Sequence, residues 1–320
     1  MKKFYLSLLT VICFFCIIGC KHPQTPGNPQ KPSDSATTGQ DTEKPNNPGS
    51  DGNEETGTGQ NTGEPVKQEA EFKNENGTMV ITKAGTISKE IFQNFIKNGT
   101  LTVAGPLTEE NYKLIGQLPI TKLDLSGATD IPGGYTQVTM SPEGVIHQNN
   151  NVIPLNFRKN TKLETVILPD TAEVLPAAAF SECSNLKSFT GKGIKIVGYC
   201  AFWGTAVETI ELPAAEEIGY SAFSKCKNLK IVSLPKAKKL YNDILYNNHY
   251  PLDIKITLPC TVEVTPGADL KPSEPQALST FRGFKTENAS LVLFGDPESE
   301  ITDKEWQGHT WKSIDCCKIN

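Results

Sequence analysis

Residues 197–235 read VGYCAFWGTAVETIELPAAEEIGYSAFSKCKNLKIVSLP, and this stretch carries one sequence pattern twice. An Ile/Val-Gly pair, an Ala-Phe pair and a Leu-Pro pair each recur after 21 or 22 residues. The pattern extends over residues 157–258, where four phenylalanines are separated by 23, 22 and 21 residues. Such regular spacing predicts a solenoid of stacked units that share one continuous core.

Each unit combines a Leu-Pro pair, an Ile-Gly pair and an Ala-Phe pair that is often followed by Cys. This combination resembles the BspA-like leucine-rich repeat family of bacterial surface proteins, whose units carry the same signposts. Two departures stand out: residues 202–205 lack the Cys, and Ile244 takes the place of the next Phe. We therefore expect an α+β repeat solenoid, a leucine-rich repeat with stacked short strands, helix-bearing N-terminal units and β-rich later units.

The strands of these units have two faces, because successive side chains alternate. In residues 163–168, Val166 and Leu168 share the core face, whereas Thr165 and Ile167 point outward. Stacking would bring outward residues about 4.8 Å apart and form a ribbon of about the area that a specific protein interface uses. The predicted outward, partner-binding residues are Thr165, Ile167, Ser188, Thr190, Thr209, Glu211, Ile231, Ser233, Lys255 and Thr257.

A second set of residues is expected to form the structural core. It consists of Phe157, Phe180, Phe202, Phe223, Cys183 and Cys226. The resemblance places both cysteines in the interior of a turn. They stand two units apart, about 10 Å, which is beyond the ~7 Å limit for a disulfide.

Three tyrosines form a third candidate set. Tyr199, Tyr220 and Tyr241 are each 21 residues apart, three positions before a Phe or before Ile244. We expect them to stack as a ladder. Tyrosine is common at interfaces, so the ladder is either a partner-binding stripe or a row of rings that pack on neighbouring units.

The first 69 residues are expected to lie outside the repeat fold. Lys2 and Lys3 precede an apolar run at residues 4–18, which predicts an export signal. A spanning helix is the alternative, but 15 residues fall short of the roughly 20 needed. Residues 17–20, Ile-Ile-Gly-Cys, resemble the lipobox of bacterial lipoproteins, which implies a signal peptide at 1–19 and lipid on Cys20. Residues 20–69 hold seven Pro and almost no aliphatic side chains, typical of a disordered Pro/Gly/Thr-rich tether.

The remaining chain divides into four segments. Residues 70–131 are predicted to hold the N-terminal cap and first repeats, including a helix that Ser88 begins and Asn98-Gly99 closes. The expected segments that follow are an irregular insertion (132–156), the BspA-like repeats (157–259) and a C-terminal cap (260–320). Trp306 and Trp311 are expected to plug the end of the core.

Composition and motifs argue against several function classes. The net charge is −5, and nucleic-acid binding usually needs a basic face. We find no Cys-x-x-Cys zinc spacing, no P-loop, no His-Glu-x-x-His and no Gly-x-Ser-x-Gly. No cofactor, metal site or catalytic residue is therefore predicted. Cys316 and Cys317 either bond each other or reach Cys260, and the sequence does not choose between these pairings.

These observations predict a binding protein of the cell envelope, without catalysis. The resemblance implies adhesion to a protein or glycan ligand on host or neighbouring bacterial cells, from a lipid-anchored, surface-exposed position on the outer membrane. Two alternatives stay open. One is a structural or assembly lipoprotein in the periplasm, and the other is a hydrolase of envelope carbohydrate or peptide, which needs Cys or carboxylate groups in a cleft.

Overall fold

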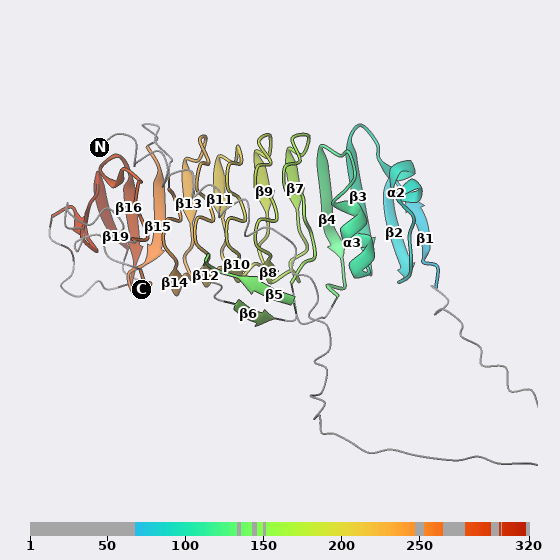
Figure 1. Cartoon of the computed structure of the whole chain (residues 1–320), viewed down its shortest axis with the longest axis horizontal. Helices are drawn as coiled ribbons and strands as arrows, with labels where there is room; N and C mark the ends of the chain where they lie inside the picture. The colour runs from blue at the N-terminus through green and yellow to red at the C-terminus, as the bar shows by residue number, and fades with distance from the viewer. Residues whose placement is uncertain are drawn as a thin grey trace, which may run out of the picture. The chain divides into compact units, whose positions relative to one another are not determined.

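The computed structural model describes residues 68–132, 136–142, 146–149, 152–246, 253–264, 279–295, 301 and 303–317. In Figure 1 these residues form a coil in which successive turns each add one strand to a long face. The expected signal peptide (1–19) and Cys20 lie outside the described residues, as does nearly all of the expected tether (20–69).

The long face consists of two sheets that follow each other along the coil. The first sheet contains, in spatial order, β1 (Glu71–Glu75), β2 (Thr78–Lys83), β3 (Thr100–Gly105), β4 (Lys122–Ala128), β7 (Thr165–Ile167) and β9 (Ser188–Thr190). The second contains β11 (Thr209–Glu211), β13 (Ile231–Ser233), β15 (Lys255–Pro259), β16 (Ser290–Phe294) and β19 (Ser313–Cys317). Neighbouring strands are parallel, except that β1 and β2 form an antiparallel hairpin.

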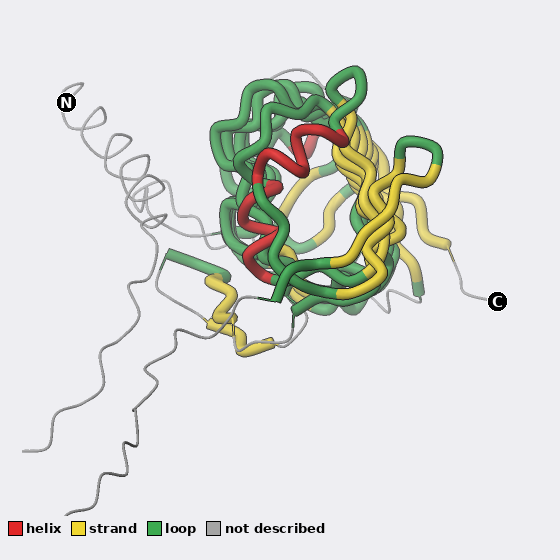
Figure 2. The backbone as a smooth tube through the Cα atoms, turned by 90° about the vertical axis from the view of Figure 1, so that its right-hand side faces the viewer, coloured by secondary structure: helices red, strands yellow, loops and turns green. Residues whose placement is uncertain are grey.

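A second, narrower face carries two-residue strands from the same turns. These strands are β8 (Val174–Leu175), β10 (Ile196–Val197), β12 (Glu217–Ile218) and β14 (Lys239–Leu240), and all pair in parallel. Two helices, α2 (Lys89–Phe95) and α3 (Glu109–Ile115), lie between the early strands in sequence. Figure 2, a view along the coil, shows the strands on one side and the helices and turns closing the circuit on the other.

The architecture is therefore a β-solenoid, consistent with a leucine-rich repeat fold, and it contains little helix. Within the described ranges, helix is limited to α2, α3 and a 3-10 turn, η1 (Thr286–Asn288). The expected α+β class thus overstates the helical part. Ser88 does cap α2, because its hydroxyl accepts a hydrogen bond from the Ile91 amide.

The predicted end of this first helix was wrong. The helix stops at Phe95, and Asn98 and Gly99 both have positive φ, at 50° and 74°. Lys97 and Thr100 exchange two backbone hydrogen bonds around them. Two central residues with φ > 0 are the signature of a tight hairpin turn, so Asn98-Gly99 leads directly into β3 instead of capping a helix.

The core is a stack of aromatic rings inside the coil. Phe157, Phe180, Phe202 and Phe223 are almost fully buried. Their ring centroids are 5.9, 5.6 and 5.8 Å apart in that order. The four rings therefore lie one above another, as the repeat spacing predicted.

The register of the next unit differs from the sequence prediction. The Phe180 and Phe202 amides bond the carbonyls of Ala201 and Ala222, which precede the next Phe. The Phe223 amide bonds the carbonyl of Ile244 in the same way. Ile244 therefore occupies the Ala position, and Leu245, fully buried, replaces the Phe. The unit is one residue longer than its predecessor, which shifts every assignment made by counting 21 residues.

The expected irregular insertion (132–156) contains an antiparallel hairpin, β5 (Thr136–Thr139) and β6 (Ile146–Asn149). Figure 1 shows it alongside the narrow face. Two of its carbonyls accept backbone hydrogen bonds from the solenoid: Thr139 from the Tyr199 amide and Met140 from the Tyr220 amide. Val138 and Met140 are buried against Val152 and Val174. The insertion thus covers part of the narrow face.

The C-terminal segment (260–320) extends the solenoid as well as closing it. Strands β16 and β19 continue the parallel sheet beyond residue 259. A small hairpin, β17 (Glu305–Trp306) and β18 (His309–Thr310), brings both tryptophans inside. The ring of Phe281 lies 6.5 Å from Trp306 and 5.2 Å from Trp311. This aromatic cluster covers the end of the core.

Candidate functional site: the outer face of the long sheets

The predicted outward residues lie in two columns along the long face. In the first column, Thr165 pairs with Ser188, and Thr209 pairs with Ile231 and then with Lys255. In the second, Ile167 pairs with Thr190, and Glu211 pairs with Ser233 and then with Thr257. All ten side chains are exposed or half-buried. The inward residues between them, Val166, Phe189, Ile210, Val232 and Ile256, are buried.

Sequence reasoning missed eight members of the same columns. Register adds Thr100, Lys122, Ser290 and Ser313 to the first column and Thr102, Asp124, Val292 and Asp315 to the second. The four members on β16 and β19 were missed because the chain between Ile256 and Leu291 breaks the 22-residue period. Alternation could not identify β16 either, because Leu291, Val292 and Leu293 are apolar and all buried.

The face is mainly polar, and its most exposed apolar side chain lies near its middle. Ile231 is 37% exposed, and among the described residues Phe72 is the other large apolar side chain with comparable exposure. Ile231 stands between Thr209 and Lys255 in the first column. An apolar centre with a polar rim is the usual composition of a protein interface.

The tyrosine ladder differs from the prediction in both length and position. Tyr199 and Tyr220 stack with centroids 5.9 Å apart, but they are only 3% and 7% exposed. Tyr241 is not equivalent to these two tyrosines. The Gly219 amide donates to the carbonyl of Val197 in the preceding unit, and the Tyr241 amide donates in the same way to the carbonyl of Ile218. Tyr241 therefore occupies the Gly position of its unit. The hairpin covers the corner where the rings stack, and their burial favours packing over partner binding.

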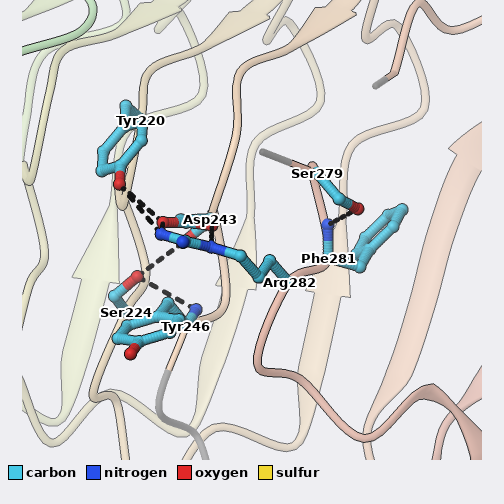
Figure 3. Close-up of polar contacts among 7 residues, drawn as sticks. All are labelled: Tyr220, Ser224, Asp243, Tyr246, Ser279, Phe281 and Arg282. Atoms are coloured by element: carbon cyan, nitrogen blue, oxygen red, sulfur yellow. Dashed lines mark hydrogen bonds and ion pairs between the residues drawn. The ribbon is translucent and has the colours of Figure 1, made fainter. Parts of the chain in front are cut away.

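Tyr220 instead belongs to a buried polar cluster (Figure 3). Its hydroxyl donates to the Asp243 carboxylate at 2.6 Å. The Arg282 guanidinium forms a bidentate ion pair with the same carboxylate: its Nε donates at 2.8 Å, and one terminal nitrogen donates to the second oxygen. The Asp243 pairing raises the pKa of Arg282. Arg282 also lies over the Tyr246 ring, 5.3 Å from its centroid. The sequence carries no periodic signal for this cluster, because Arg282 follows an interruption of the repeat.

The two core cysteines have a common environment. The Cys183 thiol donates to the Phe157 carbonyl at 3.0 Å, and the Cys226 thiol to the Phe202 carbonyl at 3.1 Å. Burial raises the pKa of Cys183 to about 12 and that of Cys226 to about 11. Neither of these two thiols takes part in a disulfide. A thiol held protonated is a poor nucleophile, which counts against these residues as catalytic groups.

Cys260 follows β15 and Cys316 lies in β19, and strand β16 lies between these two strands. Leu258 of β15 pairs with Leu293 of β16, which pairs with Cys316 of β19. Two strand spacings amount to about 10 Å, beyond disulfide range. This register does not bring Cys316 to Cys260.

Catalytic and metal-binding groupings are scarce in the described part of the chain. It holds no cluster of three His, Cys, Asp or Glu suited to a metal ion. One serine–histidine contact occurs there, between Ser279 Oγ and His309 Nε2 at 3.1 Å. Ser279 is fully buried beside the aromatic end cluster, so its hydroxyl has no access to a substrate. Nor does any helix in these ranges have the length and apolar character needed to cross a bilayer.

Solved structures of three bacterial proteins are similar to this chain. A leucine-rich repeat protein from Bacteroides ovatus is 21% identical with a TM-score of 0.37; the match covers 62% of this chain and 48% of that one, about half its length. A leucine rich repeat protein from T. pallidum is 15% identical with a TM-score of 0.35, and the match covers 66% of this chain and 78% of that one. A leucine rich cell surface protein from Faecalibacterium prausnitzii is 13% identical with a TM-score of 0.28, and the match covers 80% of this chain and 96% of that one.

No curated protein matches the sequence significantly. The profile of a repeat family, described as the BspA type leucine rich repeat region, matches residues 151–266 in six copies. This range includes the stacked phenylalanines and the strands from β8 to β15. Residues 151–266 are therefore identified as a BspA-type leucine-rich repeat region.

Proposed function

We propose that this chain is a lipoprotein of the bacterial cell envelope that binds a protein partner through the outer face of its long sheets. Leucine-rich repeat domains are generally protein-binding modules, and the family match supports that class for this chain. The finer claims are proposals: adhesion to host or neighbouring bacterial cells, lipid on Cys20, and a position on the outer membrane.

The observation that carries the proposal is the composition of the two columns. They present mainly polar side chains in the register of the parallel strands around exposed Ile231. The strands are short, and the buried residues beneath them fix their positions. Such a surface can contact a partner over many units without rearranging.

A binding screen tests this function. The purified chain is screened by surface plasmon resonance against extracellular-matrix proteins and a glycan array, and a partner is taken forward with two variants. Ile231→Glu should weaken binding at least about tenfold, because a charge would enter the apolar centre of the interface. Lys227→Glu, at an exposed position outside the two columns, should bind as the wild type does.

Other outcomes would redirect the proposal. Equal binding by Ile231→Glu and the wild type would place the partner surface elsewhere. Binding to glycans but to no protein would mean that the partner is a carbohydrate and not a protein. Treatment of intact cells with protease separates surface exposure from the periplasmic alternative, because only a surface-exposed chain would be cleaved.

A further inference from the structure

The long face is interrupted between β9 and β11. The first sheet ends at β9 and the second begins at β11, so these neighbouring strands are not hydrogen-bonded to each other (Figure 1). The Ser188 amide bonds Glu164 and the Leu212 amide bonds Ser233, both on the far side from the interruption. Successive peptide groups of a strand point to opposite sides, so those of Phe189 and Glu211 face the interruption.

The local sequence differs from the repeat at the interruption. Gly191 and Lys192 stand where the adjacent units have Leu-Pro. The Phe189 ring lies beside the position of the missing leucine: a Cβ on Gly191 would lie 2.9 Å from that ring. The ring also packs edge-on against Phe202, with centroids 4.8 Å apart. The interruption thus coincides with a departure from the Leu-Pro pattern and with an added aromatic ring in the core.

A groove of about 670 Å³ lies at the interruption, within the roughly 300–1,000 Å³ typical of ligand sites. The two sides of the groove carry opposite charge. Lys187 and Lys192 flank β9 on one side, and Glu208 and Glu211 lie on the β11 side. Lys187 and Glu208 have partners away from the groove, Glu164 at 3.9 Å and Lys230 at 2.8 Å.

Lys192 and Glu211 are different. Both are exposed, and among the described residues neither has an ion-pair partner. They lie toward the same end of their strands and share the groove with the hydroxyls of Thr190 and Thr209. Lys192 on the β9 side and Glu211 on the β11 side therefore remain available to pair with charged groups of a ligand in the groove.

We propose that this groove binds an extended polypeptide segment of the partner, with an acidic side chain at Lys192 and a basic side chain at Glu211. β9 and β11 stand within 8 Å of each other at Cα, which is too close for a further strand to enter between them, so the segment would lie across the groove and bind through its side chains. A sugar fits less well, because the one aromatic residue of the lining, Phe189, is 9% exposed and offers no open ring face. This inference rests on the proposed function and gives it a location and a ligand class.

The test uses a phage-displayed library of random 12-residue peptides, selected on the purified full chain. Selected peptides should carry both an acidic and a basic residue, and their affinity should fall with added salt. Lys192→Glu and Glu211→Lys should each weaken binding by about tenfold or more. The double variant Lys192→Glu/Glu211→Lys should select peptides in which the order of the two charges is reversed. Lys227→Glu serves as the control.

The outcomes separate the groove from the wider face. Peptides without charge preference, affinities insensitive to Lys192→Glu, or competition by glycans in place of peptides would each overturn the groove assignment. If bound peptides are lost with Ile231→Glu but not with Lys192→Glu, the proposed function stands and the groove assignment falls. Circular dichroism melts of each variant show whether a loss of binding reflects loss of the fold.

Discussion

The contacts of single residues explain why particular residue types recur in each repeat unit, as the cysteine after the Ala-Phe pair shows. The buried thiols of Cys183 and Cys226 each satisfy a carbonyl of the unit before them, so a small donor is needed at that position. The unit between them has Thr205, whose hydroxyl lies 3.3 Å from the Cys226 sulfur. The sequence predicted that the cysteines were buried. It could not show that Thr205 takes this position in the unit that departs from the pattern, with its hydroxyl against the Cys226 sulfur.

The Asp243–Arg282 pair leads to a prediction about stability. Asp243 is almost fully buried, so Arg282→Met would leave a carboxylate without its counter-charge. Removing one partner of a buried pair costs about 3 to 5 kcal/mol, and we expect a loss of that size in the free energy of unfolding measured with urea. Lys195→Met breaks the exposed pair with Glu173, 2.7 Å, and should cost less than about 1 kcal/mol. Equal effects of the two variants would contradict this account.

At the scale of elements, the strands of the regular repeats could be predicted from the sequence, but the assignments failed where the length of a repeat unit changes. The strands carrying Val166, Ile210 and Val232 follow alternation, and all three residues are buried. The tyrosine at 241 was misassigned because its unit gains one residue, which no pattern within the unit marks. The groove at β9 and β11 was missed for a related reason. Gly191 and Lys192 were visible as departures, but the loss of strand pairing there depends on how the units pack in three dimensions.

The C-terminal element should respond to pH through His309. Its ring lies against Phe281, with centroids 5.7 Å apart, and burial lowers the pKa of His309 below 6.5. The folded state therefore favours neutral His309, and the unfolded state binds more protons as pH falls through 6.5. The stabilisation by neutral His309 is present above that pH and is lost below it.

The measurement is a thermal melt followed by tryptophan fluorescence between pH 7.5 and 5.5, because Trp306 and Trp311 report on this element. The midpoint of the wild type should fall toward pH 5.5. His309→Gln, which cannot titrate, should show a smaller change over the same range. A wild-type midpoint that is constant or rises on acidification would contradict the assignment.

At the scale of the whole molecule, ion pairs join consecutive units on the exposed surface. They recur at one-unit spacing: Glu164–Lys187, Glu173–Lys195, Glu208–Lys230 and Glu216–Lys238. Exposed pairs contribute little energy individually. Their recurrence nevertheless fits a solenoid, in which stability depends on contacts between nearest neighbours. At the β9–β11 joint the long face lacks strand pairing, so the two stacks meet there through their core and through the narrow face, where β10 pairs with β12.

The proposed anchor gives the last prediction, which concerns where the whole chain resides. Residues 4–18 form an apolar run that ends at the Ile-Ile-Gly-Cys sequence, and acyl chains on Cys20 would hold the chain at a membrane, since each buried methylene contributes about 0.8 kcal/mol. Cys20→Ala should therefore move the chain from the membrane fraction to the soluble fraction and abolish incorporation of labelled palmitate. Cys16→Ala is the matched control, because under this proposal Cys16 would be removed with the signal peptide, so its substitution should change neither result. Continued membrane retention of Cys20→Ala would mean that the apolar run itself stays in the bilayer, and the partner-binding face would then be held by a helix in place of a lipid.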